Sequence, residues 1–141
     1  MSTQVTVSFK NQLSEIERLG QLVTEFAERH QWSPRILFEM NVALEELLTN
    51  VISYAYDDNQ EHEITLRLSF VDGELTAELA DDGRPFNPLE AADPDLSIPL
   101  EERPIGGLGI FLVRKFTTDL AYQRRDGKNF LTLKKKITSE E

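Results

Sequence analysis

The order of two hydrophobic periods constrains the fold of this chain more than any other feature. Residues 5–9 alternate apolar and polar side chains, as a half-buried strand does. Two segments with helical spacing follow directly, over residues 13–27 and 34–56. The first has capping-box spacing at residues 14–17, and in the second a proline at the first helical position follows a serine N-cap. The chain therefore begins with a strand and two successive helices.

The remainder adds two hairpins and one short helix. Residues 64–79 alternate around an Asp-Gly turn, and residues 122–137 alternate around a second one. Residues 110–116 have the spacing of a short helix. The order β-α-α-β-β-loop-α-β-β predicts an α+β fold, a two-layer sandwich with helices on one face of a mixed, mostly antiparallel sheet. The length fits a single domain over residues 1–141.

Composition excludes several classes of protein. The 141 residues are 40% hydrophobic and 28% charged, which is typical of a globular chain and not of a disordered one. The absence of cysteine excludes disulfides, thiol catalysis and cysteine-ligated zinc. A net charge of −10 opposes direct binding to nucleic acid or to an anionic membrane. No apolar run is long enough to span a membrane and the N-terminus lacks signal-peptide features, so we expect a cytoplasmic protein.

A polar arc on the second helix is the first candidate site. Glu39, Glu46, Asn50 and Ser53 gather opposite a broad apolar face. A solvated helix face explains Glu39 and Ser53. Asn50 is less easily explained, because asparagine is a poor helix former away from a cap. Glu46 and Asn50 are four residues apart, so their side chains are neighbours on the helix surface.

The second candidate is the sequence Asp81-Asp82-Gly83, directly after a predicted strand. An ordinary Asp-Gly turn is one interpretation. The other is a carboxylate at a strand end that accepts a hydrogen bond from a ligand amino group. In that case the glycine lets the backbone approach the ligand closely.

The third candidate is a glycine cluster, residues 106–109, at the start of the last helix. It follows residues 84–105, which contain five of the six prolines and show no regular period. Backbone N–H groups at a glycine-rich helix start form an anion site. A flexible hinge or close packing is the alternative. The cluster is neither a Walker A loop nor a dinucleotide-binding fingerprint, because it lacks the lysine of the first and the preceding strand of the second.

Together and in this order, the three motifs resemble the ATP-binding (Bergerat) fold of the GHKL superfamily, which includes gyrase, histidine kinases and MutL. The resemblance extends from about Val5 to Ile137. The sequences Asp-Asp-Gly-x-Pro-Phe-x-Pro and Gly-Gly-Leu-Gly-Ile-Phe-Leu-Val are most similar to those of the RsbW-like anti-sigma-factor serine kinases.

The resemblance implies roles for individual residues. Asn50 would hold the Mg²⁺ that bridges the phosphates of ATP, and Glu46 would be the general base. Asp81 would accept a hydrogen bond from the adenine amino group, with Gly83 behind it. Thr132, in the last strand, would support the adenine end of the site.

The resemblance also implies that residues 84–105 are an ATP lid and that Gly106, Gly107 and Gly109 meet the phosphates. Arg103 is the best candidate cation for the γ-phosphate, since arginine matches phosphate geometry; a salt bridge with an acidic lid residue is the alternative. Two features depart from the family pattern. Pro85 replaces a second glycine, and the lid is acidic.

Three functions follow from these observations. The first is an ATP-dependent protein serine kinase that binds a sigma factor and phosphorylates a STAS-type anti-sigma antagonist. The second is a non-catalytic ATP-binding regulator that acts by capturing partners, favoured by the two departures. The third is the catalytic part of a histidine kinase or of another GHKL ATPase. It is the weakest, because neither His30 nor His62 lies in a recognisable phosphoacceptor hairpin. Homodimerisation is expected from the resemblance.

Overall fold

A computed structural model describes residues 3–90 and 107–137 of the chain. Within these residues the elements follow the predicted order. They are β1 (Gln4–Lys10), α1 (Ile16–Arg29), α2 (Pro34–Tyr54), β2 (Glu63–Val71), β3 (Glu74–Asp81), α3 (Gly107–Phe116), β4 (Asp119–Arg125) and β5 (Lys128–Lys136). Short 3₁₀ turns lie at Leu13–Glu15 and Pro88–Glu90.

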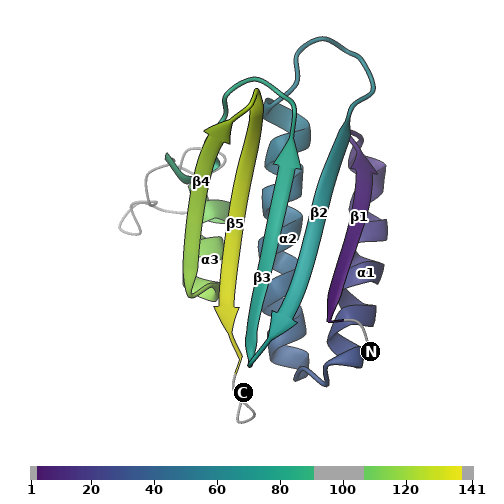
Figure 1. The fold of residues 1–141 in the computed structure, drawn as a ribbon, viewed down its shortest axis with the longest axis vertical. Helices are drawn as coiled ribbons and strands as arrows, with labels where there is room; N and C mark the ends of the chain where they lie inside the picture. The colour runs from purple at the N-terminus through teal and green to yellow at the C-terminus, as the bar shows by residue number, and fades with distance from the viewer. Residues whose placement is uncertain (1–2, 91–106, 138–141) are drawn as a thin grey trace.

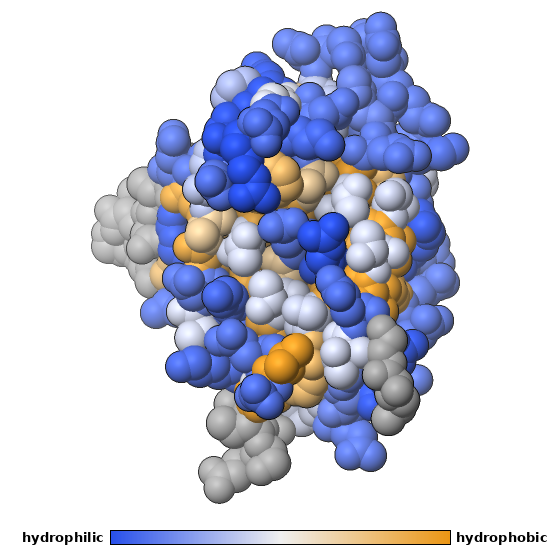
Figure 2. Space-filling view, viewed as in Figure 1, coloured by the Kyte–Doolittle hydropathy of each residue, from blue (hydrophilic) through white to orange (hydrophobic). Residues whose placement is uncertain are grey.

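The strands form one five-stranded sheet in the order β1-β2-β3-β5-β4. Each of its four strand pairs is antiparallel, so the predicted α+β sandwich is confirmed and the described strands include no parallel pair. All three helices cover the same face of the sheet (Figure 1). Figure 2 shows the opposite face, which none of the described helices covers and on which mostly hydrophilic and weakly hydrophobic side chains are exposed.

Alternating burial in the central strands explains this two-layer arrangement. Along β3, Leu75, Ala77 and Leu79 are buried, whereas the residues between them are partly exposed. The buried set faces the apolar side of α2, on which Met40, Leu44 and Leu48 are at most 2% exposed. Strand and helix periodicities therefore meet in one core. None of the helices in residues 3–90 and 107–137 is long and apolar enough to cross a bilayer.

The helix starts agree with the sequence in one case and differ in two. At α2, the Ser33 hydroxyl accepts a hydrogen bond from the backbone N–H of Ile36 at 3.2 Å, as a serine N-cap should. The capping box predicted at Ser14 is wrong, because α1 begins at Ile16 without a side-chain cap. The carboxylate of Glu15 instead accepts from the backbone N–H of Lys10 at 2.9 Å. Helix α3 begins at Gly107, earlier than predicted.

Candidate functional site

The polar arc of α2 contains a hydrogen-bonded pair, the buried Asn50 and the partly buried Glu46. The Asn50 side chain is 8% exposed, and its Nδ2 donates to the carbonyl oxygen of Glu46 at 2.8 Å and to Oε1 of Glu46 at 3.0 Å. Both amide protons are thereby used, and no described group donates to Oδ1 of Asn50. Amide oxygens are ligands that Mg²⁺ accepts, so Oδ1 is the atom of this pair suited to a metal. The other two members of the arc differ: Ser53 is exposed, and Glu39 pairs with Lys135 of β5 at 3.8 Å.

The first turn of α3 packs directly on this pair. A Cβ atom added at Gly109 would lie 2.0 Å from Oε1 of Glu46, so a side chain at that position would displace the carboxylate. Gly107 is the first residue of the helix. The N-terminus of α3, where free N–H groups attract anions, is therefore next to Glu46 and Asn50. Arg103 and Gly106 lie outside the described residues.

The end of β3 holds a second buried polar group. Asp81 is 3% exposed, and its Oδ1 accepts from the backbone N–H of Gly83 and from Nδ2 of Asn129, each at 2.9 Å. Burial raises the pKa of Asp81. No hydrogen bond to Oδ2 comes from the described residues, which leaves that oxygen as the acceptor for an amino group.

Gly83 is required here by close packing. A Cβ atom at this position would lie 2.4 Å from the carbonyl oxygen of Ala55, the C-cap of α2. That carbonyl also accepts from the backbone N–H of Arg84 at 2.9 Å. The end of β3 is therefore held against the end of the helix that carries Glu46 and Asn50. The Asp-x-Gly sequence thus serves packing as well as a possible ligand.

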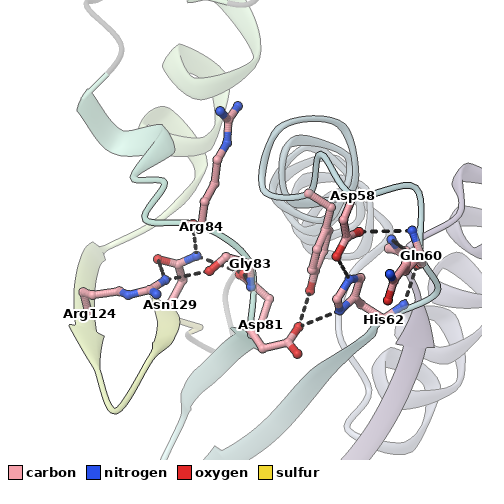
Figure 3. A network of polar contacts seen from close by, with 11 residues as sticks. Asp58, Gln60, His62, Asp81, Gly83, Arg84, Arg124 and Asn129 are labelled. Carbon is pink, nitrogen blue, oxygen red and sulfur yellow. Dashed lines mark hydrogen bonds and ion pairs between the residues drawn. The ribbon is translucent and has the colours of Figure 1, made fainter.

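Asn129 of β5 is the residue that the sequence analysis missed. It is 1% exposed and lies opposite Asp81 in the sheet. Besides Asp81, its Nδ2 donates to the carbonyl oxygen of Arg84 at 2.8 Å, and its Oδ1 accepts from Arg124 (Figure 3). Its Oδ1 also accepts from the Tyr122 hydroxyl. The sequence did contain a signal for Asn129. It is a polar residue two positions before Leu131 and four before Leu133, on the same inward-facing side of the strand.

Thr132 is not brought to this cluster. It pairs with Glu78 of β3, and both residues are on the partly exposed register positions of their strands. Directly opposed residues of an antiparallel pair point to the same face, so Thr132 faces the uncovered side of the sheet. Asp81 and Asn129 face the helices. The site as described thus contains Glu46, Asn50, Gly109, Asp81 and Gly83, with Asn129 added.

These groups form a site with two ends that meet beside the C-terminal half of α2. One end offers a carboxylate oxygen in a buried frame, suited to the amino group of a base. The other offers an amide oxygen for a hard cation, a glutamate, and a helix N-terminus for phosphate. An adenine nucleotide with its metal ion carries the complementary groups in the same order.

Comparisons with known proteins agree with this geometry. The model of the histidine kinase-like ATPase domain matches residues 9–135. The chain therefore belongs to the histidine kinase-like ATPase domain family.

Two curated relatives show to which class of protein within this family the chain is most similar. The serine/threonine-protein kinase BtrW of Bordetella bronchiseptica is 37% identical over 107 residues, which cover 76% of this chain and 75% of the relative. The serine-protein kinase RsbW of Oceanobacillus iheyensis is 28% identical over 120 residues, covering 82% and 75%. The predicted similarity to RsbW is confirmed: the chain is an RsbW-like protein serine/threonine kinase.

Solved structures confirm the fold. The RsbU and RsbW domains of Rv1364c from Mycobacterium tuberculosis superpose with a TM-score of 0.69 at 11% identity, covering 94% of this chain and 32% of that one. The histidine kinase domain of a blue-light activated kinase from Erythrobacter litoralis gives a TM-score of 0.56 at 16% identity, covering 89% and 60%. The chain thus spans about a third of the first structure and under two thirds of the second.

Proposed function

We propose that this chain transfers the γ-phosphoryl group of Mg-ATP to a serine or threonine hydroxyl of a STAS-type anti-sigma antagonist, and that it acts as an anti-sigma factor. The observation that supports this most is the contact between Gly109 and the carboxylate of Glu46, beside Asn50. It joins a base, a metal ligand and a phosphate-binding helix start in one place. The names of the relatives support a protein as the acceptor.

In this mechanism Asp81 recognises the adenine base through a hydrogen bond. Its Oδ1 is occupied by two N–H donors, which fixes the orientation of the carboxylate. Its Oδ2 then accepts a hydrogen bond from the 6-amino group. A guanine carbonyl at that position would instead face a carboxylate oxygen, so the site should prefer adenine.

At the other end, Asn50 would hold Mg²⁺ through Oδ1, and the ion would supply charge neutralisation to the phosphates. Glu46 accepts the proton of the attacking hydroxyl. The hydroxyl oxygen forms a bond to the γ-phosphorus as the bond from that phosphorus to the β–γ bridging oxygen breaks. Adenosine diphosphate leaves, and Glu46 ends protonated. The glycines at the start of α3, Gly106 included, and Arg103 would contact the phosphates.

The proposed partners are those that the resemblance to RsbW-like anti-sigma-factor kinases implies. We propose that a sigma factor binds the same chain, that the phosphorylated antagonist no longer binds it, and that the chain forms homodimers. Binding to a sigma factor would place the protein in the cytoplasm. A non-catalytic regulator that binds ATP and acts by partner capture is the second candidate. The hydrogen bond between Nδ2 of Asn50 and Oε1 of Glu46 favours it, because that bond occupies the proposed base.

The test is phosphoryl transfer from radiolabelled Mg-ATP to a STAS-type antagonist, with nucleotide binding measured in parallel by thermal shift. We expect Glu46→Gln to bind Mg-ATP as the unaltered protein does but to lose at least about a hundredfold in transfer rate. The neighbouring Glu45→Gln is the matched control and should retain transfer. Binding without transfer in the unaltered protein would establish the non-catalytic regulator. An absence of binding would overturn both functions.

A further inference from the structure

A histidine lies between two carboxylates beside the adenine end of the site. His62 precedes β2, at the end of the segment that leads from α2. Its Nε2 is 2.8 Å from Oδ2 of Asp58 (Figure 3). Its Nδ1 is 3.3 Å from Oδ1 of Asp82. The His62 side chain is 19% exposed, so water has limited access to the ring.

This geometry selects one protonation state. A neutral imidazole has one N–H group and one lone pair, so it can donate to one carboxylate only. The lone pair would then face the second carboxylate at hydrogen-bond distance, which is repulsive. The imidazolium ion donates at both nitrogens and satisfies both. In agreement, the hydrogen bond that His62 donates to Asp58 raises the pKa of His62, and the pKa of Asp58 is lowered, first by the Gln60 backbone N–H and then by His62.

The same cluster is attached to the proposed nucleotide site. Tyr56 stacks on the His62 ring, with centroids 4.4 Å apart and planes 19° apart, and its hydroxyl donates to Oδ1 of Asp82 at 3.2 Å. Asp82 directly follows Asp81. His62 thus fastens the segment after α2 to the residue beside the adenine-reading carboxylate.

Other contacts hold the far side of this segment. The backbone N–H of His62 donates to Oδ1 of Asn11 at 2.8 Å, and the backbone N–H of Asn11 donates to the carbonyl of His62 at 3.1 Å. The backbone of His62 is therefore held in place independently of Asp82. A change in the bond between them falls on the end of β3 and not on the segment that carries the histidine.

We propose that His62, with both ring nitrogens protonated, is a positioning residue for Asp81, and that nucleotide affinity falls as pH rises and His62 loses a proton. This inference rests on the proposed function. The neutral ring releases one carboxylate, and the end of β3 loses a fixed contact. The titratable groups that face the ring are Asp58, Asp82 and Tyr56. Burial, with the charges of Asp81 and Asp82, raises the pKa of Tyr56, so it stays protonated throughout. Lys10 is directed to Glu61, at 3.6 Å.

The experiment is the dissociation constant of Mg-ADP between pH 6 and pH 9 for the unaltered protein, His62→Gln, His62→Arg and His30→Gln. We expect affinity to fall with rising pH in the unaltered protein and in His30→Gln, the control histidine. His62→Gln should bind weakly with little pH dependence beyond that of the ligand. His62→Arg keeps a permanent cation with several donors and should bind tightly over the range.

Linkage supplies a second readout that a merely structural role would not move. If protonation of His62 favours binding, bound Mg-ADP must raise the pKa of His62 by the same coupling, about one unit for each tenfold change in affinity. Proton NMR of the His62 ring, with and without nucleotide, measures this. Equal pH profiles for the unaltered protein and His62→Gln, or an unmoved pKa, would overturn the inference and leave the proposed function standing. An absence of Mg-ADP binding at every pH would overturn both.

Discussion

At the end of β3, Asp81 lies in a frame of fixed partners, whereas at the start of α3 the two functional side chains of α2 are hydrogen-bonded to each other. Oδ1 of Asp81 receives two N–H donors, one of them from the backbone of Gly83. Glu46, by contrast, is held by Nδ2 of Asn50 and by the contact with Gly109. The first arrangement is formed before any ligand binds.

The two ends of the site differ in how much their side chains must rearrange when a ligand binds. A preformed acceptor binds the adenine amino group without reorganisation, which favours affinity. The hydrogen bond between Glu46 and Asn50 must change in length or angle when a cation binds Oδ1 of Asn50 and a hydroxyl group approaches Glu46. We therefore expect the adenine end to provide binding that does not depend on the metal, and the phosphate end to provide metal-dependent binding and chemistry.

The largest effect is expected from Gly109→Ala, which acts on the phosphate end alone. The new Cβ would lie 2.0 Å from Oε1 of Glu46. Because this is the tip of a flexible side chain, the fold can adapt, but the carboxylate must move. We expect phosphoryl transfer to fall by about a hundredfold or more while thermal stability stays near that of the unaltered protein.

Gly20→Ala in α1 is the matched control for this change. Its nearest neighbours, Asn41 and Glu45, would be 3.8 Å from the new Cβ, which is ordinary contact. The substitution should leave transfer intact and should stabilise α1 by roughly 0.5–1 kcal/mol, as alanine does relative to glycine in a helix. Equal transfer rates for the two variants would show that the contact at Gly109 does not position Glu46.

The second prediction distinguishes the adenine end of the site from the phosphate end by the ligands that each one binds. Asp81→Asn should weaken the binding of ATP and of metal-free adenosine alike, by about 10- to 100-fold, because a charge-assisted hydrogen bond is lost. Asn50→Ala should leave adenosine binding unchanged and remove the gain in affinity that Mg²⁺ gives to ATP. Calorimetric titration with adenosine, ATP and Mg-ATP distinguishes them. An Mg²⁺ gain that survives in Asn50→Ala would place the metal ligand elsewhere.

The two ends also differ in how far the sequence could predict them. Glu46 and Asn50 are four residues apart on one helix, so their contact follows from helical geometry alone. Gly83 and Asp81 are likewise local. The capping box at Ser14 failed because a tertiary group, the backbone N–H of Lys10, takes the carboxylate of Glu15. Local spacing gives no information on such a contact.

Asn129 shows most clearly which part of the site could not be predicted from the sequence. Its contact with Asp81 joins residues 48 positions apart and depends on the register between β3 and β5. Thr132 is three positions after Asn129, and residues an odd number of positions apart in a strand point to opposite faces. Alternation around the buried Leu131 and Leu133 assigns Thr132 to the opposite face, whereas the residue of β3 that Asn129 meets is set by the register between the two strands. The order of elements, by contrast, depends only on local periods and was predictable.

The third prediction tests whether Asn129 or Thr132 supports the adenine end of the site. Asn129→Ala removes the donor to the carbonyl of Arg84 and one of the two N–H donors to Oδ1 of Asp81, and a hydrogen bond to a charged group contributes about 1.5–3 kcal/mol. We expect lower thermal stability and several-fold weaker adenosine binding. Thr132→Ala, on the uncovered face, should change neither. If Thr132→Ala weakens adenosine binding and Asn129→Ala does not, Thr132 supports the adenine.

The smallest effect is expected on the acidic side of the pH profile. Burial raises the pKa of Asp81 above that of an aspartate in the unfolded chain, so the folded protein takes up a proton there more readily than the unfolded chain does. Lowering the pH through that raised value therefore does not cost stability through this group. It does neutralise the acceptor, whose Oδ1 is already fixed by two N–H donors. Adenosine, which carries no titrating phosphates, should bind more weakly as the pH falls through the raised pKa of Asp81.

The comparison for this acidic limb is Asp81→Asn, in which no carboxyl group titrates at the strand end. Its adenosine affinity should be weak and should lack the acidic decline, whereas the unaltered protein should show it. Protonation of Asp81 would then limit binding at low pH and deprotonation of His62 would limit it at high pH, so that the adenine end binds best between the two. A decline of equal size in both proteins would assign the acidic limb to a group outside the β3 end, and the fixed carboxylate would no longer explain how that end differs from the pair on α2.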